Sequence, residues 1–315
     1  MKDKPLVSII IPTHNRKEKL IRLINSILES DYPKDKLEII IVDDASTDGT
    51  YEEVKRNFPE VRIIHNEKEL LLAGSRNAGI RSCRGGYIFL IDDDNVVDKN
   101  CILELVEAME NSSNSPLGIV APFMYYYKHP NRVWCAGVKM NMITSVTSFP
   151  NRDKIDKGKF RNFIESSVGA PNAFMIKREV IEKVGLFDDR LFPINYDESD
   201  FGERVKKAGY KIAFNPKAKV WHDTPLPEES REKVRCFGVH NELRAYYFGR
   251  NRIIFCKKYS RRWQFLIFIS IFNWLITLYY AKIILLYSKE PLKRRLKIVK
   301  SYLKGVLDGI KLRVY

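Results

Sequence analysis

The sequence predicts an α/β fold with a mostly parallel central sheet, followed by a basic, aromatic and helical C-terminal region. Short apolar runs alternate with segments of helical periodicity through the first half of the chain, and several runs are unbroken stretches of Ile and Val. Strands that helices cover on both faces show such runs. The charge is also divided, because residues 1–230 carry 34 Lys/Arg and 35 Asp/Glu whereas residues 231–315 carry 20 and 4. The whole basic excess therefore lies in the C-terminal region, as in a surface-binding or targeting segment.

The predicted elements follow one another in a regular order. Leu20, Leu23 and Ile24 recur at helical spacing in the first predicted helix, and Pro12 ends the strand before it. Residues 125–165 lack this rhythm, and such a long irregular stretch is typical of a functional loop region. We expect strands at residues 6–11, 37–42, 61–65, 87–91 and 118–123, helices at 17–30, 50–58, 75–83 and 101–110, and further strands and helices over 167–185 and 199–223.

The cysteines and the N-terminus exclude some classes of protein. The five cysteines form no CxxC pair, so a structural zinc site and a disulfide framework are not expected. A reducing compartment fits this cysteine usage. Residues 1–15 have a short apolar core without a small-residue cleavage pattern, so we expect them to form the first strand rather than a signal peptide.

Polar and acidic residues follow three of the predicted strands. Residues 12–16 follow the first strand, Asp43 and Asp44 the second, and Asp92–Asp94 the fourth. Ligands bind at the carboxyl ends of the strands in an open parallel sheet. Three adjacent carboxylates repel one another there, and a divalent cation that holds a phosphate would relieve the repulsion. An acidic, solvated turn is the alternative on these residues alone.

Seven motifs resemble, in order and approximate spacing, the family-2 glycosyltransferases of the nucleotide-sugar-binding GT-A fold. They span about residues 5–225 and read VSIIIPTHNR, IIIVDDASTDGT, AGSRNAGI, FLIDDD, GAPNAFMIKREVIEKVGLFDDRLF, DESDFGERVKKAGYKI and VWHD. The resemblance implies a catalytic domain at 1–230, with a nucleotide-binding half at 1–123 and an acceptor-binding half at 124–230. It implies hexosyl transfer from a nucleotide-diphosphate sugar to a hydroxyl, with Mn²⁺ or Mg²⁺ as cofactor. A weaker resemblance favours rhamnosyltransferase-like members.

The same resemblance implies roles for the strand-end residues. Asp92, Asp93 and Asp94 match the DxD motif, with Asp92 facing the sugar or ribose and Asp94 binding the metal. The implied metal ligands are Asp94, Asp92 and His222. The nucleotide-sugar is expected to contact, besides Asp92 and Asp93, the residues Pro12, Thr13, Asn15, Arg16, Asp43, Asp44, Arg76 and Asn77. A structural helix-capping role is the alternative for Asp43, and a solvated helix start at Ser75 is the alternative for Arg76 and Asn77.

The acidic motif after residue 196 implies the general base. Alignment through SDFGERVKKAGY places the base at Glu198, where the family more often has Asp, so Asp197 remains a competitor. One base without a covalent nucleophile implies a single displacement with inversion. We expect Asp200 and Arg204 to form a structural i,i+4 ion pair.

Two further segments are candidates for the acceptor side. The small residues 169–171 would allow an acceptor to approach the protein closely. Tyr125–Tyr127 and Trp134 would form a platform for a sugar or an acceptor, with ordinary packing as an equal alternative.

The C-terminal region contains an apolar segment between basic flanks. Phe265–Ala281 is 17 uncharged residues long, at the lower limit for a membrane-spanning helix. A single span would place one basic flank outside, against the usual Lys/Arg bias. We therefore predict a helix in the membrane plane or a re-entrant hairpin, on an anionic membrane surface at the cytoplasmic face, and an acceptor that is a lipid-linked saccharide, a polyprenyl carrier or another glycan. A single span, a buried core helix and a homodimer helix are the alternatives for residues 231–315.

Three other functions fit the sequence less well. A sugar nucleotidyltransferase would be expected to carry a Gly-rich phosphate loop after the first strand, and PTHNRKEKL contains no glycine. Nucleic acid is not an expected partner, because the basic residues flank an apolar helix rather than a readout motif. An inactive lipid- or sugar-binding module would not need the intact acids at 92–94 and 197–198.

Overall fold

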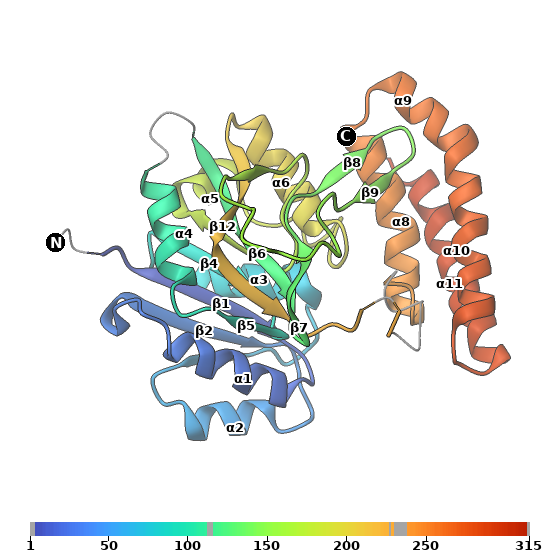
Figure 1. Cartoon of the computed structure of the whole chain (residues 1–315). Coiled ribbons are helices and arrows are strands. Elements are labelled where there is room, and N and C mark those ends of the chain that lie inside the picture. The colour runs from blue at the N-terminus through green and yellow to red at the C-terminus, as the bar shows by residue number, and fades with distance from the viewer. Residues whose placement is uncertain (1–3, 112–115, 227, 230–237, 314–315) are drawn as a thin grey trace.

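The computed structural model describes residues 4–111, 116–226, 228–229 and 238–313, and its centre is a ten-stranded sheet (Figure 1). The sheet order is β10-β12-β6-β11-β4-β1-β2-β3, with β5 beside β12 and β7 beside β6. Its strands are β1 (Val7–Thr13), β2 (Leu37–Asp43), β3 (Arg62–His65), β4 (Tyr87–Ile91), β5 (Asn95–Val97), β6 (Leu117–Tyr126), β7 (His129–Cys135), β10 (Ile164–Glu165), β11 (Ala173–Lys177) and β12 (Lys211–His222). A separate hairpin pairs β8 (Lys139–Asn141) with β9 (Val146–Ser148).

Helices cover the sheet and form a second body beside it. The helices of the first 222 residues are α1 (Lys17–Leu28), α2 (Thr50–Asn57), α3 (Leu71–Ser82), α4 (Cys101–Glu110), α5 (Arg178–Val184) and α6 (Asp197–Lys207), with a 3₁₀ turn at Lys34–Lys36. The later helices are α8 (Glu242–Tyr259), α9 (Arg262–Ile267), a π-helical stretch (Phe268–Phe272), α10 (Asn273–Tyr287) and α11 (Leu292–Lys311).

The pairing of the strands confirms the predicted α/β fold with a mostly parallel sheet. β1 pairs in parallel with β2 and β4, β2 with β3, and β6 with β12. The antiparallel strands are β11, between β4 and β6, β7 beside β6, and the short β5 and β10 beside β12. The Ile runs of β1 and β2 are fully buried, because they lie in the centre of the sheet beneath helices on both faces.

Three boundaries differ from the sequence prediction. Pro12 lies inside β1, where it is tolerated because the β1–β4 pairing stops at Ile10 and Pro12 faces only β2. Helix α3 begins at Leu71 rather than at residue 75, because Leu72 and Ala73 are good helix formers that extend it toward the N-terminus. The region 125–165 is not wholly irregular, since it contains β7, β8, β9 and β10.

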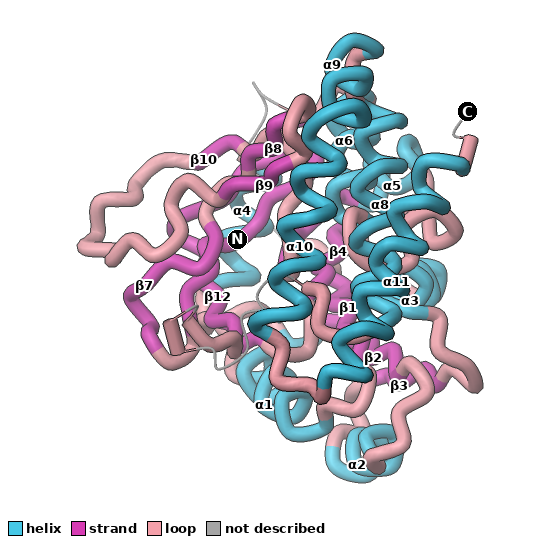
Figure 2. The backbone as a smooth tube through the Cα atoms, turned by 90° about the vertical axis from the view of Figure 1, so that its right-hand side faces the viewer, coloured by secondary structure: helices cyan, strands magenta, loops and turns pink. Residues whose placement is uncertain are grey.

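The C-terminal helices stand side by side next to the sheet (Figures 1 and 2). They enclose a second apolar core that includes Ile253, Ile284 and Tyr302. Helix α8 also contributes Ile254 and Phe255 to the main core, so it belongs to both bodies. The predicted domain boundary at residue 230 lies outside the described residues and stays a prediction. The described cysteines are buried free thiols, namely Cys83, Cys101, Cys135 and Cys256.

Residues 262–287 form one long helix with an apolar outer face. By length and composition this 26-residue helix is long and apolar enough to cross a membrane, and 22% of its most apolar window is buried. One such helix is weak evidence by itself for a span. Its exposed large apolar side chains are Trp263, Leu266, Ile267, Ile271, Trp274, Leu275, Leu278, Tyr279, Leu286 and Tyr287.

Glycines allow α8 and α11 to pack at very short range, which gives a prediction. A Cβ atom at Gly305 of α11 would lie 2.0 Å from the backbone oxygen of Tyr246 of α8. Gly305→Ala should therefore lower the free energy of unfolding by about 1–3 kcal/mol through overpacking, although alanine is intrinsically the better helix former. The control is Gly86→Ala, where a Cβ atom meets nothing within 4 Å. Equal melting temperatures for the two variants would contradict the close packing.

Candidate active site

The sheet topology brings the carboxyl ends of four strands to one edge. β1, β2 and β4 are parallel neighbours, and β12 runs in the same direction because it is parallel to β6 and separated from β4 by the antiparallel β11. Thr13, Asp43, Asp92 and His222 therefore lie at or just beyond the same edge of the sheet. This is the edge at which the sequence predicted a ligand site.

The three acids after β4 point to different partners. Asp92 accepts a hydrogen bond from Arg76, Asp93 accepts from Thr13 and Arg16, and Asp94 lies beside His222 and Arg16. Arg76 and Arg16 therefore offset the mutual repulsion of the three acids, and a solvated turn does not describe them. Asp93 is 4% exposed.

Asp93 anchors the loop that follows β1. Thr13 Oγ1 donates to Asp93 Oδ2 at 2.8 Å, and Arg16 Nη1 donates to Oδ1 at 3.0 Å. Burial raises the pKa of Asp93 to about 7, in spite of the opposing effect of Arg16. Both oxygens of the Asp93 carboxylate thus accept hydrogen bonds, one from Thr13 and one from Arg16, and the bond to Arg16 fixes the position of its guanidinium.

Asp94 and His222 are brought together by a strand pair. β5 follows the acid triplet directly and pairs with the end of β12, so that Asp223 N donates to Asp94 O at 2.8 Å. His222 Nε2 lies 3.4 Å from Asp94 Oδ1, and the Trp134 ring packs edge-on against the imidazole with a centroid distance of 4.4 Å. Burial raises the pKa of Asp94, but His222 and Arg16 outweigh it and hold that pKa below its usual value.

The candidate metal ligands do not all face one point. Among the described residues, no group of three or more His, Cys, Asp or Glu side chains is arranged to hold a metal ion. Asp94 and His222 are adjacent, whereas the Asp92 carboxylate turns to Arg76. Of the three predicted ligands, one carboxylate and one imidazole therefore lie together, and the imidazole Nδ1 is buried without a partner among the described residues.

Arg76 of α3 is the centre of the other half of the site. Its side chain is fully buried, Nη1 donates to Asp197 Oδ2 at 2.8 Å, and Nη2 donates both to Asp92 Oδ1 at 2.8 Å and to Glu198 Oε1 at 2.7 Å. Burial lowers the pKa of Arg76, but the three carboxylates outweigh it and hold that pKa above its usual value. The two candidate bases and the first DxD acid therefore share one cation. The alternative of a solvated helix start at Ser75 is wrong.

Glu198 and Asp197 differ in exposure. The Asp197 side chain is 3% exposed, while that of Glu198 is 20% exposed. Both hydrogen bonds to Glu198 within the described residues, from Arg76 and from Asn172 N at 2.9 Å, reach Oε1. Burial raises the pKa of Glu198 to about 7, and burial also raises the pKa of Asp197. Glu198 is thus the carboxylate of the two that has an oxygen left for another molecule.

Glycine at two positions lets the start of α6 approach the preceding loop. Gly169 has a φ of +39°, and a Cβ atom there would lie 2.5 Å from Glu198 O. A Cβ atom at Gly202 would lie 2.4 Å from Gly169 N. The close approach predicted at residues 169–171 is therefore made by the chain's own helix, and it positions Glu198.

Helix α8 holds the same helix start from the other side. Asn251 Nδ2 donates to Ile194 O at 2.9 Å, in the turn before α6. Lys258 Nζ and Tyr259 OH donate to Asp200 Oδ1 at 2.7 and 2.6 Å, and Arg204 Nε donates to Asp200 Oδ2 at 3.0 Å. The predicted Asp200–Arg204 pair is confirmed, and α8 extends it into a network that fixes α6.

The residues at the end of β2, Asp43 and Asp44, form a second part of the site, separate from the Arg76 cluster. Asp43 is fully buried and bonds His65 Nδ1 at 2.7 Å, and its other oxygen accepts from Ser46 N. Asp44 Oδ1 accepts from Asn66 Nδ2 and Leu70 N, both at 2.8 Å. These bonds shape the turn that contains Asp44, while Arg16 bonds Asp93 and Asp94.

Some predicted contact residues lie in the interior. Asn77 is 1% exposed, and its amide bonds Phe187 and Asp189, so the prediction that it contacts the nucleotide is not supported by its position. Pro12 is buried in β1. Asn15 is exposed and accepts from Thr47 N at 2.7 Å, across the loops that follow β1 and β2.

Two of the four side chains in the predicted aromatic platform, Tyr125 and Tyr126, pack inside the protein. Tyr125 and Tyr126 are 2% and 1% exposed, and their hydroxyls donate to Asp156 and Asp153. Trp134 reaches the site through its contact with His222, and Tyr127, which is 39% exposed, donates its backbone N–H to His222 O at 3.0 Å.

Arg244, near the start of α8, interacts electrostatically with Arg16 and with acids of the site, which the sequence analysis did not predict. Burial and the neighbouring Arg16 lower the pKa of Arg244, against the opposing effect of Asp92, Asp197 and Asp94. Within the described residues its guanidinium makes no ion pair. The C-terminal region thus adds a cation near the acids, and only the +16 charge balance of residues 231–315 hinted at it.

The family follows from a comparison with known sequences. Residues 8–185 match the family model described as glycosyl transferase family 2. The chain belongs to this family. It is also 28% identical over 237 residues to a probable glycosyltransferase of Bacillus subtilis, YdaM, and this match covers 71% of the chain and 52% of YdaM. The chain therefore spans about half the length of this curated relative.

Solved structures of glycosyltransferases share the fold. The crystal structure of GalNAc-T7 with UDP, GalNAc and Mn²⁺ matches with a TM-score of 0.59 and 19% identity over 89% of this chain and 59% of that chain. The mannosyltransferase PcManGT of Pyrobaculum calidifontis, in complex with GDP-Man and Mn²⁺, matches with a TM-score of 0.56 and 16% identity over 98% of this chain and 88% of that chain. This likeness confirms the GT-A fold. The rhamnosyl preference stays a prediction.

Replacement of Arg76 tests the buried carboxylate cluster. Arg76→Met should lower the free energy of unfolding by about 3–5 kcal/mol at neutral pH, because it leaves three carboxylates without their cation. This decrease in the free energy of unfolding should become smaller as the pH falls, because the carboxylates become protonated and no longer need the cation. Arg56→Met removes an ion pair from an arginine that is 71% exposed and should change stability by less than about 1 kcal/mol. Urea titrations that give equal losses for both variants would contradict the arrangement.

Proposed function

We propose that this protein transfers a sugar from a nucleoside-diphosphate sugar to a hydroxyl group of an acceptor, by a single displacement with inversion. Membership of the family supports sugar transfer. The observation that carries the proposal is that Asp92 and Glu198 accept hydrogen bonds from the same nitrogen, Nη2 of Arg76. A base is thereby held beside the acid that the resemblance assigns to the donor sugar, and no covalent nucleophile is required.

Glu198 acts as the general base in this proposal. Its free oxygen would accept the proton of the acceptor hydroxyl while Arg76 and Asn172 hold the other oxygen. A raised pKa suits a base that works near neutral pH. Asp197, which is nearly closed to solvent, would keep Arg76 in place.

The donor would lie along the strand ends. Asp44 would accept hydrogen bonds from the nucleobase of the donor, and Asn15, Thr13 and the turn at Asp43 would surround that nucleobase. Arg16 and Arg244 are the cations that stand near the acids and would bind the diphosphate. Both arginines carry their charge at any physiological pH, so they favour departure of the anionic leaving group.

A divalent cation fits the pair formed by Asp94 and His222. A carboxylate oxygen suits Mn²⁺, an imidazole nitrogen is a common metal ligand, and both structural neighbours contain Mn²⁺. Asp94 and His222 would hold the ion, and the diphosphate and water would supply the remaining ligands. The bound ion would neutralise charge on the leaving diphosphate. Asp92 would join the ligands only by leaving Arg76.

Substitution of Glu198 tests the base. Glu198→Gln should lower the rate of transfer by about 10²–10⁴-fold with donor affinity unchanged, because an amide cannot take up the proton. The wild-type rate should rise with pH up to about 7, the pKa to which burial raises Glu198, and then level off. The variant should lose that rise. Asp197→Asn should be milder, and the reverse ranking in steady-state kinetics would assign the base to Asp197.

Substitution of Asp94 tests the metal. Asp94→Asn should abolish the increase in donor affinity that Mn²⁺ or Mg²⁺ produces, because it removes a charged oxygen ligand, and His222→Ala should weaken it less. The exposed Glu60→Gln is the control. Calorimetric titration of a nucleoside diphosphate with and without the metal measures the effect. Normal turnover of Asp94→Asn in EDTA would overturn the assignment.

The C-terminal helices support binding in the plane of a membrane surface. Buried Arg252 of α8 donates to Asn273 and Thr277 of α10, so the inner face of α10 is fixed to α8. Helix α11 carries seven Lys/Arg, and helices with such charge do not enter the hydrocarbon core. Since α8, α10 and α11 pack as one body, α10 would lie at the interface with its apolar side chains toward lipid. This placement favours a lipid-linked acceptor, with the site on the cytoplasmic side.

Charge on the outer face of α10 should abolish membrane binding. Leu275→Glu with Leu278→Glu places two acids on side chains that are 57% and 69% exposed. The double variant should no longer sediment with anionic liposomes at low salt, because it loses apolar insertion and gains repulsion. Ile155→Glu with Phe163→Glu, at 56% and 51% exposure elsewhere, should sediment like the wild type. A wild-type protein that does not sediment with anionic liposomes at low salt would contradict the proposal.

A further inference from the structure

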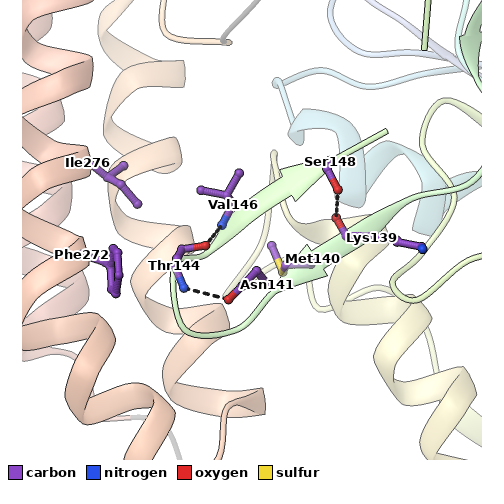
Figure 3. Close-up of a pocket in the computed structure, with 8 residues that line it drawn as sticks. All are labelled: Lys139, Met140, Asn141, Thr144, Val146, Ser148, Phe272 and Ile276. Atoms are coloured by element: carbon purple, nitrogen blue, oxygen red, sulfur yellow. Dashed lines mark hydrogen bonds between the residues drawn. The ribbon is translucent and has the colours of Figure 1, made fainter. Parts of the chain in front are cut away.

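A cavity lies between the β8–β9 hairpin and the long apolar helix, away from the strand-end site (Figure 3). Its volume is about 540 Å³, within the range of about 300–1,000 Å³ that is usual for small-ligand sites. Met140 and Val146 of the hairpin and Phe272 and Ile276 of the helix supply its apolar wall. In Figure 3, Phe272 and Ile276 point from the helix toward the hairpin.

The helix side of the cavity adjoins the face that the proposed function places toward lipid. Ile271 and Leu275, each one residue before a lining residue, are 53% and 57% exposed. Val146, on the hairpin side, is 52% exposed. Exposed apolar side chains therefore adjoin the cavity on both its helix side and its hairpin side.

The hairpin side of the cavity is tied to the candidate base. Met140 N donates to Ser167 Oγ at 3.2 Å, and the neighbouring Ser166 Oγ donates to Gly169 O at 2.7 Å. Gly169 packs against the backbone of Glu198. The cavity is thus one short segment of chain away from the carboxylate that would activate the acceptor.

The hairpin also carries a cation on the side away from the helix. Lys139 is exposed, and its ammonium group points away from Phe272 and Ile276 in Figure 3. Within the described residues it makes no ion pair. The apolar wall and the cation thus lie on opposite sides of the hairpin. An amphiphile could place its hydrocarbon chain against the wall and its anionic head near Lys139.

We propose that the cavity binds the first hydrocarbon units of a prenyl-phosphate-linked acceptor, with Lys139 toward its phosphate. This inference rests on the proposed function, because it needs a lipid-linked acceptor. Bulk membrane lipid would instead contact the whole outer face of α10 and α11, which the cavity does not require. The cavity therefore acts as a specificity site for the carrier lipid of the acceptor.

Photolabelling of the full-length protein in detergent tests the proposal. The probe is farnesyl phosphate with a diazirine in its hydrocarbon chain, and the labelled peptides are mapped by mass spectrometry. Label should concentrate in residues 139–148 and 271–276, and unlabelled farnesyl phosphate should compete for it whereas inorganic phosphate should not. Val146→Trp fills the cavity and should lower the labelling at least ten-fold, while Ile155→Trp, a similar enlargement at an exposed site outside the cavity, should leave it unchanged.

Two outcomes overturn the cavity as a lipid site. One is label spread over the outer faces of α10 and α11, and the other is labelling that Val146→Trp does not reduce. Donor turnover, measured in the same preparation as release of nucleoside diphosphate from UDP- and GDP-sugars, separates this failure from failure of the proposed function. If the protein turns over a donor but no label appears in the cavity, only the lipid site is wrong. If none of these UDP- and GDP-sugars is turned over, the proposed function is wrong.

Discussion

The guanidinium of Arg76 is fully buried between β4 and α6 and donates to Asp92, Asp197 and Glu198. A buried cation without partners would be costly, and so would three buried carboxylates without a cation, so each half of the cluster requires the other. Because the acids come from two distant parts of the chain, the cluster also fixes how the loop after β4 meets the start of α6. The position of Glu198 beside the donor end of the sheet depends on this one side chain.

The start of α6 is held by two further contacts that come from opposite directions. On one side Gly169 lies against its backbone, where a side chain would collide. On the other side α8 bonds the preceding turn through Asn251 and bonds Asp200 through Lys258 and Tyr259. Since α8 also contributes to the second apolar core, the helices that are proposed to meet the membrane and the helix that carries the proposed base form one packed unit. Attachment to a membrane would therefore orient the site as well as concentrate it.

The sequence was sufficient for the parallel sheet, because unbroken Ile runs such as those of β1 and β2 require burial on both faces. The strand-end acids could also be located, since carboxyl ends of parallel strands meet at one edge. The sequence could not show that Asp92 turns to Arg76 while Asp94 turns to His222, because the directions of adjacent side chains depend on partners far away in the chain. Arg244 was missed for a related reason. It lies in no motif, and only the packing of α8 on the main core brings it near the acids.

The most direct test of the Arg76 cluster is the pKa of Glu198 itself. Carbon-13 NMR of the glutamate side-chain carboxyls, titrated against pH and assigned by the signal lost in Glu198→Gln, measures it. Burial beside two other carboxylates predicts a midpoint of about 7, well above the ordinary value of about 4.3. A midpoint at the ordinary value would mean that Glu198 is solvated, and the buried cluster around Arg76 would not exist as described.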